Sequence, residues 1–109
     1  MPYNPEIDDR IQRAMAGWRY TEAKKMFGGV CHLYKGHMVC GVYKDFLILR
    51  LGEEQAAKTL QSDNVQPFDI TGRPMKGWVM VSGNGFKTDA DLNSWLMRAA
   101  EFVRSLPPK

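Results

Sequence analysis

Two cysteines and two histidines lie close together in the sequence and have the residue types that bind zinc. They are Cys31, His32, His37 and Cys40. Zinc accepts two thiolates and two imidazoles in a tetrahedron. On the predicted strands, however, side chains alternate, so that both cysteines point to one sheet face and both histidines to the other. Ligands divided in this way cannot converge on one ion, and we expect no metal site.

The same strand alignment places Cys31 directly opposite Cys40. A cross-strand disulfide would fit this geometry, whereas a cytoplasmic compartment would keep the two thiols reduced. A buried cysteine packs as a small hydrophobic residue. Neither cysteine lies in a Cys-x-x-Cys motif, which would favour a reactive thiolate. We therefore expect reduced thiols in the core.

Other residue combinations that enzymes use are incomplete. Residues 83–85 (Gly-Asn-Gly) precede a predicted helix but lack the glycine spacing and the Lys-Ser/Thr of a phosphate-binding loop. Glu53 and Glu54 are adjacent, so they point apart on a helix. His32 and His37 have no predicted hydroxyl or thiol partner for general-base catalysis. We predict no catalytic residue, no cofactor and no enzymatic activity.

A basic segment at residues 73–78 (Arg-Pro-Met-Lys-Gly-Trp) has two interpretations. Arg73 and Lys76 could contact an anion or a partner as a candidate loop. Alternatively, Pro74 and Gly77 set the geometry of a turn and Trp78 packs in the core. We favour the second interpretation, because such a turn requires no ligand.

These residues are positioned by a predicted four-strand antiparallel meander between Glu22 and Leu51. Its turn signals are two glycines at 28–29, Lys-Gly at 35–36 and Lys-Asp at 44–45. Two-residue loops at these positions fix the registers, and the pairs next to the loops are Phe27 with Val30, Tyr34 with His37, and Tyr43 with Phe46.

Alternation along these strands separates two faces. The face predicted to form the core consists of Met26, Cys31, Leu33, Met38, Cys40, Val42, Leu47, Leu49 and Leu51. The opposite face mixes aromatic, aliphatic and basic side chains, and such patches mark interaction surfaces. This candidate interaction face consists of Phe27, His32, Tyr34, His37, Val39, Tyr43, Phe46, Ile48 and Arg50. The alternative is that terminal segments or residues 65–74 cover it.

The remaining elements follow from capping and periodicity. Asn4 and Pro5 begin a helix with an apolar stripe, and residues 53–60 form a short second helix. Pro67 makes residues 65–70 an edge strand, and residues 77–82 form a well-covered strand. Thr88 caps the last helix, which Pro107 ends. The predicted class is α+β, in the order α-β-β-β-β-α-β-β-α, with an antiparallel sheet covered on one face by helices.

Length and composition indicate a single domain spanning residues 1–109. The chain is 44% hydrophobic and 25% charged, which is typical of globular proteins. No apolar run approaches the ~20 residues that span a bilayer, and the N-terminus lacks a signal-peptide pattern. We expect a cytoplasmic protein without membrane contact. The net charge of +3 is scattered over all elements, so nucleic-acid binding is compatible but not favoured.

The chain resembles the N-terminal domain family of TfoX/Sxy, named after bacterial regulators of natural competence. The matching segments are residues 25–29 (Lys-Met-Phe-Gly-Gly), 36–42, 47–50, 68–77 and 105–109. Among them, the Gly-Arg-Pro-Met-Lys-Gly block at 72–77 is fairly specific. The resemblance implies an α+β domain with an antiparallel sheet backed by helices. In the longer regulators a second helical domain follows, and they act as coactivators of transcription beside a DNA-binding partner.

Together these observations predict a non-enzymatic protein-interaction domain linked to transcriptional regulation. A protein partner or self-association would occupy the candidate interaction face. The alternative function is a small-ligand or nucleic-acid module that uses the aromatic and basic residues of the same face, with Arg73 and Lys76.

Overall fold

Six strands form one antiparallel sheet in the computed structural model, which describes residues 3–26, 28–68 and 76–107. The strand order is β1-β2-β3-β4-β6-β5. The strands are β1 (Thr21–Met26), β2 (Gly29–Tyr34), β3 (His37–Tyr43), β4 (Phe46–Arg50), β5 (Val65–Pro67) and β6 (Trp78–Val81). The predicted α+β class and element order are confirmed, and Pro67 lies on an edge strand as predicted.

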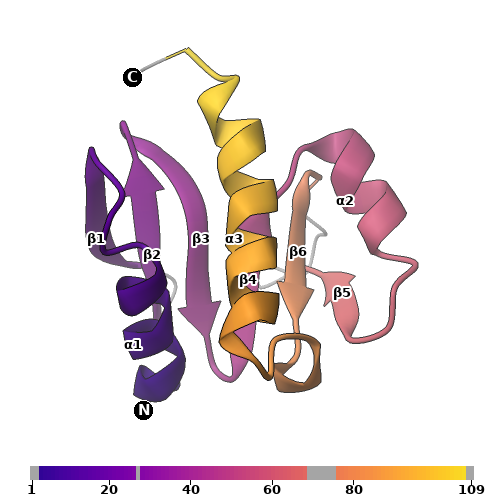
Figure 1. Ribbon diagram of the computed structural model, residues 1–109. Coiled ribbons are helices and arrows are strands. Elements are labelled where there is room, and N and C mark those ends of the chain that lie inside the picture. Colours follow the sequence, from indigo (N-terminus) through magenta and orange to yellow (C-terminus); the bar gives the residue numbers. More distant parts are fainter. Residues whose placement is uncertain (1–2, 27, 69–75, 108–109) are drawn as a thin grey trace.

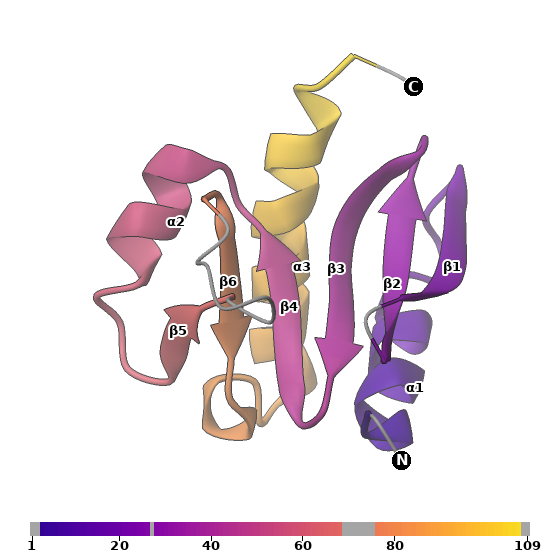
Figure 2. The same cartoon turned by 180° about the vertical axis from the view of Figure 1, so that it is seen from behind.

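Three helices complete the fold: α1 (Pro5–Ala14), α2 (Glu53–Thr59) and α3 (Asp89–Arg104). α1 and α3 lie side by side on one face of the sheet, and α2 stands beside its β6 end (Figure 1). Viewed from behind, β3 and β4 lie in front of α3 (Figure 2). In the described part of the chain no helix covers these two strands on that side.

Side-chain caps fix where the two packed helices begin. The Asn4 side chain accepts a hydrogen bond from the Glu6 amide at 2.9 Å, and Pro5 takes the first helical position. The Thr88 hydroxyl accepts from the Asp91 amide at 3.0 Å at the start of α3. Each bond satisfies a backbone donor that has no partner within the helix. Both caps were predicted from the sequence.

The main core lies between the sheet and these two helices. α3 contributes its predicted apolar stripe, with Leu92, Leu96 and Val103 fully buried. Ile7 and Ile11 do the same for α1. Against them pack side chains of the central strands: Val30, Val39, Cys40, Val42, Leu47, Leu49, Val79 and Val81. Burying this much apolar surface is the main stabilising contribution to the fold.

The hairpin registers were predicted in part. Tyr34 pairs with His37, and Tyr43 pairs with Phe46, as the two-residue turns require. The first hairpin differs, since Val30 pairs with Lys25 rather than with Phe27, which lies outside the described residues. Because the shift is of two positions, Lys25 still lies on the same side of the sheet as His32, as predicted.

A β-bulge in β3 reverses part of the predicted face assignment. His32 pairs with Cys40 while Leu33 pairs with Met38, so Val39 has no partner on β2. A bulge inserts one residue into a strand and changes which side chains share a face. Val39 and Cys40 therefore both pack in the helix-covered core, although they are consecutive. Strict alternation cannot describe this strand.

The predicted core face is correct for β4 and for the second half of β3, and wrong for β2 and the first residues of β3. Cys31, Leu33 and Met38 lie on the face opposite α1 and α3, as their pairing and neighbours show. Four members of the candidate interaction face lie instead on the helix-covered side: His32, Tyr34, His37 and Val39. Tyr43, Phe46 and Ile48 occupy the predicted face.

Among the described residues, none of the helices is both long enough and apolar enough to cross a bilayer.

Candidate interaction surface and buried polar cluster

An aromatic and methionine-rich cluster occupies the sheet face opposite α1 and α3. Ile48, Phe68 and Met80 are buried at its centre, and half-buried side chains surround them. We call this set the aromatic face: Met38, Tyr43, Phe46, Ile48, Phe68, Trp78 and Met80. The Phe68 and Trp78 ring centroids are 5.9 Å apart at an interplanar angle of 44°, within the range of favourable aromatic pairs.

Two cations pack on rings of this face. The Lys44 Nζ lies 5.4 Å from the centre of the Tyr43 ring. The Arg50 guanidinium lies 5.5 Å from the Trp78 ring and 5.7 Å from the Phe102 ring of α3. These are cation–π distances, so the rings gain an attraction and the charges remain near the surface. Aromatic residues, methionine and arginine are the residue types enriched in protein interfaces.

Asp8 and His32 form a buried hydrogen-bonded pair that the sequence did not reveal. The His32 Nε2 lies 2.7 Å from the Asp8 Oδ1, with the side chains 6% and 12% exposed. Gln12 donates to the second carboxylate oxygen at 2.6 Å. From the sequence, Asp8 belonged only to the acidic first turn of a helix. No local pattern indicates that β2 would bring a histidine to it.

His37 connects the β2–β3 hairpin to the end of α3. Its Nε2 hydrogen-bonds to the Pro107 carbonyl oxygen, which can only accept, so the nitrogen carries the proton. Its Nδ1 is buried without a hydrogen-bond partner in the described structure. His37 therefore anchors the segment after α3, and it does not lie on the aromatic face.

Cys31 and Cys40 lie on opposite sides of the sheet. Cys31 pairs with Gly41, and the neighbouring Cys40 points the other way, where its thiol contacts the Met15 sulfur at 3.8 Å. The predicted direct opposition of the two cysteines is wrong because of the bulge. Both are buried with free thiols. Burial raises the pKa of the Cys31 thiol to about 11. Burial, Cys31 and the Asp8 carboxylate together raise the pKa of Cys40.

The remaining candidate residues are dispersed. Within residues 3–26, 28–68 and 76–107, the His, Cys, Asp and Glu side chains form no group of three that could hold a metal ion. Lys76 lines a cavity of about 380 Å³ between α2 and the β5–β6 strands, together with Leu60, Pro67 and Trp78. Arg73, its predicted companion in the candidate loop, lies outside the described residues, as does Phe27.

An open antiparallel sheet with helices packed on one face defines a small α+β domain. The family model described as the TfoX N-terminal domain matches residues 13–103. The chain therefore belongs to the TfoX N-terminal domain family. A search of curated proteins found no match, and a search of solved structures found none either.

Proposed function

We propose that this chain is a non-enzymatic protein-binding domain whose contact surface is the aromatic face. The observation that carries the proposal is the cluster of half-buried Met38, Tyr43, Phe46 and Trp78 on a sheet face that no described helix covers. Contiguous patches of this composition on a soluble domain are typical of interfaces.

The edges of the sheet are poorly suited to strand addition, which favours a contact through the face. β5 has three residues and contains Pro67. The solvent-exposed residues of β1 include Glu22, Lys24 and Lys25, and lysines on an edge strand discourage pairing with another chain.

A second copy of the chain is the occupant that we propose. A two-fold contact needs only one self-complementary patch, and two-fold dimers are the commonest soluble oligomers. Paired aromatic faces would bury the four half-buried side chains against equivalent rings. Membership in the TfoX N-terminal domain family supports a link to transcriptional regulation, because the longer regulators that the chain resembles act as coactivators.

The alternative of a small-ligand or nucleic-acid module on the same face has less support. It required His32 and His37 beside the aromatic residues, and both histidines lie on the opposite side of the sheet. Arg50 and Lys44 remain, but each already packs on a ring.

Light scattering across a concentration series tests the proposal. We expect a dimer, and we expect Phe46→Glu or Tyr43→Glu to weaken dimerisation about tenfold or more, because a charge would be buried without a partner. Met97→Glu is the matched control, since Met97 is 50% exposed and lies on α3. A dimer that survives both face variants, or a chain that stays monomeric at about 1 mM, would contradict the proposal.

A further inference from the structure

A cavity of about 350 Å³ lies between the α1–β1 connection, the end of β2 and the second half of α3. Residues 17–20, Tyr34, Ala100 and Arg104 form its walls. The volume is at the lower end of the range for small-molecule sites, about 300 to 1,000 Å³. Because Tyr34 and α3 belong to the helix-covered side of the sheet, this cavity is separate from the aromatic face.

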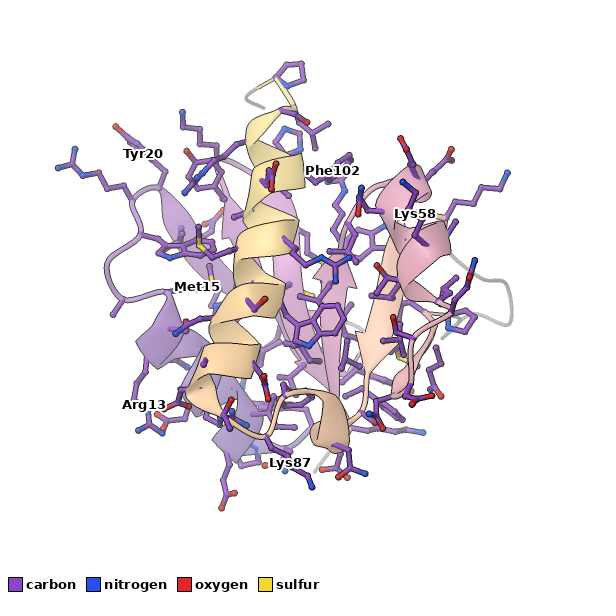
Figure 3. The ribbon with its side chains drawn as sticks, turned by 45° about the vertical axis from the view of Figure 1, so that its right-hand side comes forward. Arg13, Met15, Tyr20, Lys58, Lys87 and Phe102 are labelled. Atoms are coloured by element: carbon purple, nitrogen blue, oxygen red, sulfur yellow. The ribbon has the colours of Figure 1, made fainter. Side chains whose placement is uncertain are left out.

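Three aromatic rings line the cavity, from Trp18, Tyr20 and Tyr34. Trp18 and Tyr34 are half-buried and pack on the main core, which fixes their orientation. Tyr20 is 67% exposed and projects from the surface (Figure 3). Rigid rings beside an open wall provide a stacking surface for a planar group.

The same site collects positive charge, and no carboxylate in the described part of the chain pairs with it. Arg19 and Arg104 line the cavity, and the Lys35 Nζ lies 5.2 Å from the Tyr20 ring and 5.5 Å from the Tyr34 ring. None of these three cations forms an ion pair within the described residues, and the cavity walls contain no acidic side chain. Among the other basic residues that the structure describes, Arg10, Arg13, Lys24 and Lys58 pair with carboxylates, and the rest form no ion pair. Unpaired cations around a hollow attract anions.

The backbone at the rim is held in an uncommon conformation. Tyr20 and Lys35 have φ values of 63° and 51°, and the Lys35 amide donates to the Tyr20 carbonyl at 2.9 Å. The left-handed region is unfavourable for a residue other than glycine. At Lys35 a hairpin turn explains the value, but Tyr20 lies outside any hairpin. Its conformation keeps an aromatic ring at the cavity in spite of this cost.

We propose that this cavity binds a nucleoside 5′-monophosphate, either free or as the phosphorylated end of a single-stranded nucleic acid. The base would stack on the aromatic rings, as bases do in sequence-tolerant binding sites. The phosphate would pair with Arg19 and Arg104, whose planar guanidinium groups match its oxygens.

A titration of the full chain with 5′-AMP tests this assignment. Isothermal calorimetry and the Trp18 indole signal in NMR spectra measure the binding. We expect saturable binding of 5′-AMP, with adenosine and inorganic phosphate each about tenfold weaker or more, because each keeps only half of the contacts. The proposal would be overturned if adenosine or phosphate bound as tightly as 5′-AMP, or if 5′-AMP showed no saturation at about 5 mM.

Variants test whether the named side chains form the site. Arg104→Glu and Arg19→Glu should each weaken 5′-AMP binding about tenfold. Tyr20→Asn should weaken it a few-fold, since asparagine tolerates the left-handed backbone and removes only the ring. Lys87→Glu is the control, because it makes the same charge change far from Tyr20 (Figure 3). Equal losses in Lys87→Glu and Arg104→Glu would contradict a defined site.

A thymidine hexanucleotide with or without a 5′-phosphate distinguishes the two sources of the ligand. Tighter binding of the phosphorylated strand than of 5′-AMP would assign the site to nucleic-acid ends, and weaker binding would assign it to free nucleotides. The proposal would be overturned if the unphosphorylated strand bound as tightly as the phosphorylated one. The Phe46→Glu variant should bind 5′-AMP as the parent chain does. A test that disproves the dimer therefore leaves the nucleotide site untouched, and the reverse also holds.

Discussion

Asp8 is the residue whose role depends most on long-range contacts. It lies in the first turn of α1, yet it is 8% exposed and bonded to His32 on β2. Its neighbour Asp9 pairs with Arg13 on the surface, with both side chains more than half exposed. The two adjacent carboxylates therefore contribute differently to the free energy of unfolding. Burial strengthens the Asp8–His32 interaction and increases the cost of breaking it.

Removal of the Asp8 carboxylate should be strongly destabilising. Asp8→Ala leaves the His32 Nε2 buried without an acceptor, and we expect a loss of about 3 kcal/mol in the free energy of unfolding. Asp9→Ala on the same helix should change it by less than about 0.5 kcal/mol. Urea denaturation measures both values. Equal, small losses in the two variants would show that the buried pair contributes little.

The two thiols should be unreactive in the folded chain. Both pKa values are raised by burial, that of Cys31 from 9.0 to about 11. We expect no labelling by a disulfide reagent at about pH 8 in buffer and complete labelling in urea, because reaction requires an exposed thiolate. Rapid labelling of the native protein would contradict the described burial.

The same shift predicts a loss of stability at alkaline pH. The native state keeps the Cys31 proton at pH values at which the unfolded chain releases it. The unfolded state therefore binds fewer protons, and the stability contribution, complete below pH 9.0, is lost as the pH rises toward about 11. Unfolding curves at intervals across this window measure the slope, and Cys31→Ala should reduce it. An unchanged slope in that variant would assign the loss to other groups.

At the scale of elements, the β2–β3 pair decides which side chains face the helices. Gly41 lies in this pair, and a Cβ atom there would approach the Val30 carbonyl oxygen to 2.6 Å and the Cys31 Cα to 3.3 Å. Backbone atoms in a paired strand cannot move aside as a flexible side chain can. The close approach of the two strands therefore depends on glycine.

Gly41→Ala should destabilise the fold by about 1 to 3 kcal/mol, the usual cost of an added methyl group in a packed interior. Gly83→Ala is the control, because a Cβ at Gly83 would meet no heavy atom within 4 Å. Thermal unfolding of both variants beside the parent chain measures the difference. A Gly41 variant as stable as the Gly83 variant would show that β2 and β3 are less closely packed.

Elements with a local signal were predictable from the sequence, and features made by distant pairing were not. The caps at Asn4 and Thr88, the two-residue turns and the edge position of Pro67 all depend on neighbouring residues. The bulge at Val39 depends on how β3 pairs with β2, and no residue type in the segment marks it. One inserted position was enough to place His32 and Tyr34 on the helix side.

The candidate surfaces also divide into a part that the sequence predicts and a part that it does not. Tyr43, Phe46 and Ile48 were placed on the correct face because β4 pairs without irregularity. The cavity beside Tyr20 was not predicted, since its walls come from residues 17–20, Tyr34, Ala100 and Arg104. Those segments meet only when α3 packs across the sheet. Sequence spacing carries no signal for such a meeting.

At the scale of the whole molecule, the two faces of the sheet differ in what they carry. One face holds the main core, the buried Asp8–His32 pair and the charged cavity at its margin. The other presents the aromatic face, which we assign to contact with a second copy. The radius of gyration of 12.6 Å is close to the ~13 Å typical of a compact domain of this length.

A dilution series of amide and indole NMR spectra tests the central claim most directly, because it locates the contact surface in the unmodified chain. We predict that signals of Met38, Tyr43, Phe46 and the Trp78 indole shift with concentration, while those of Met97 and Tyr20 stay constant. Shifts centred on Met97 or Tyr20, or spectra that do not change up to about 1 mM, would contradict the assignment of the aromatic face as the interface.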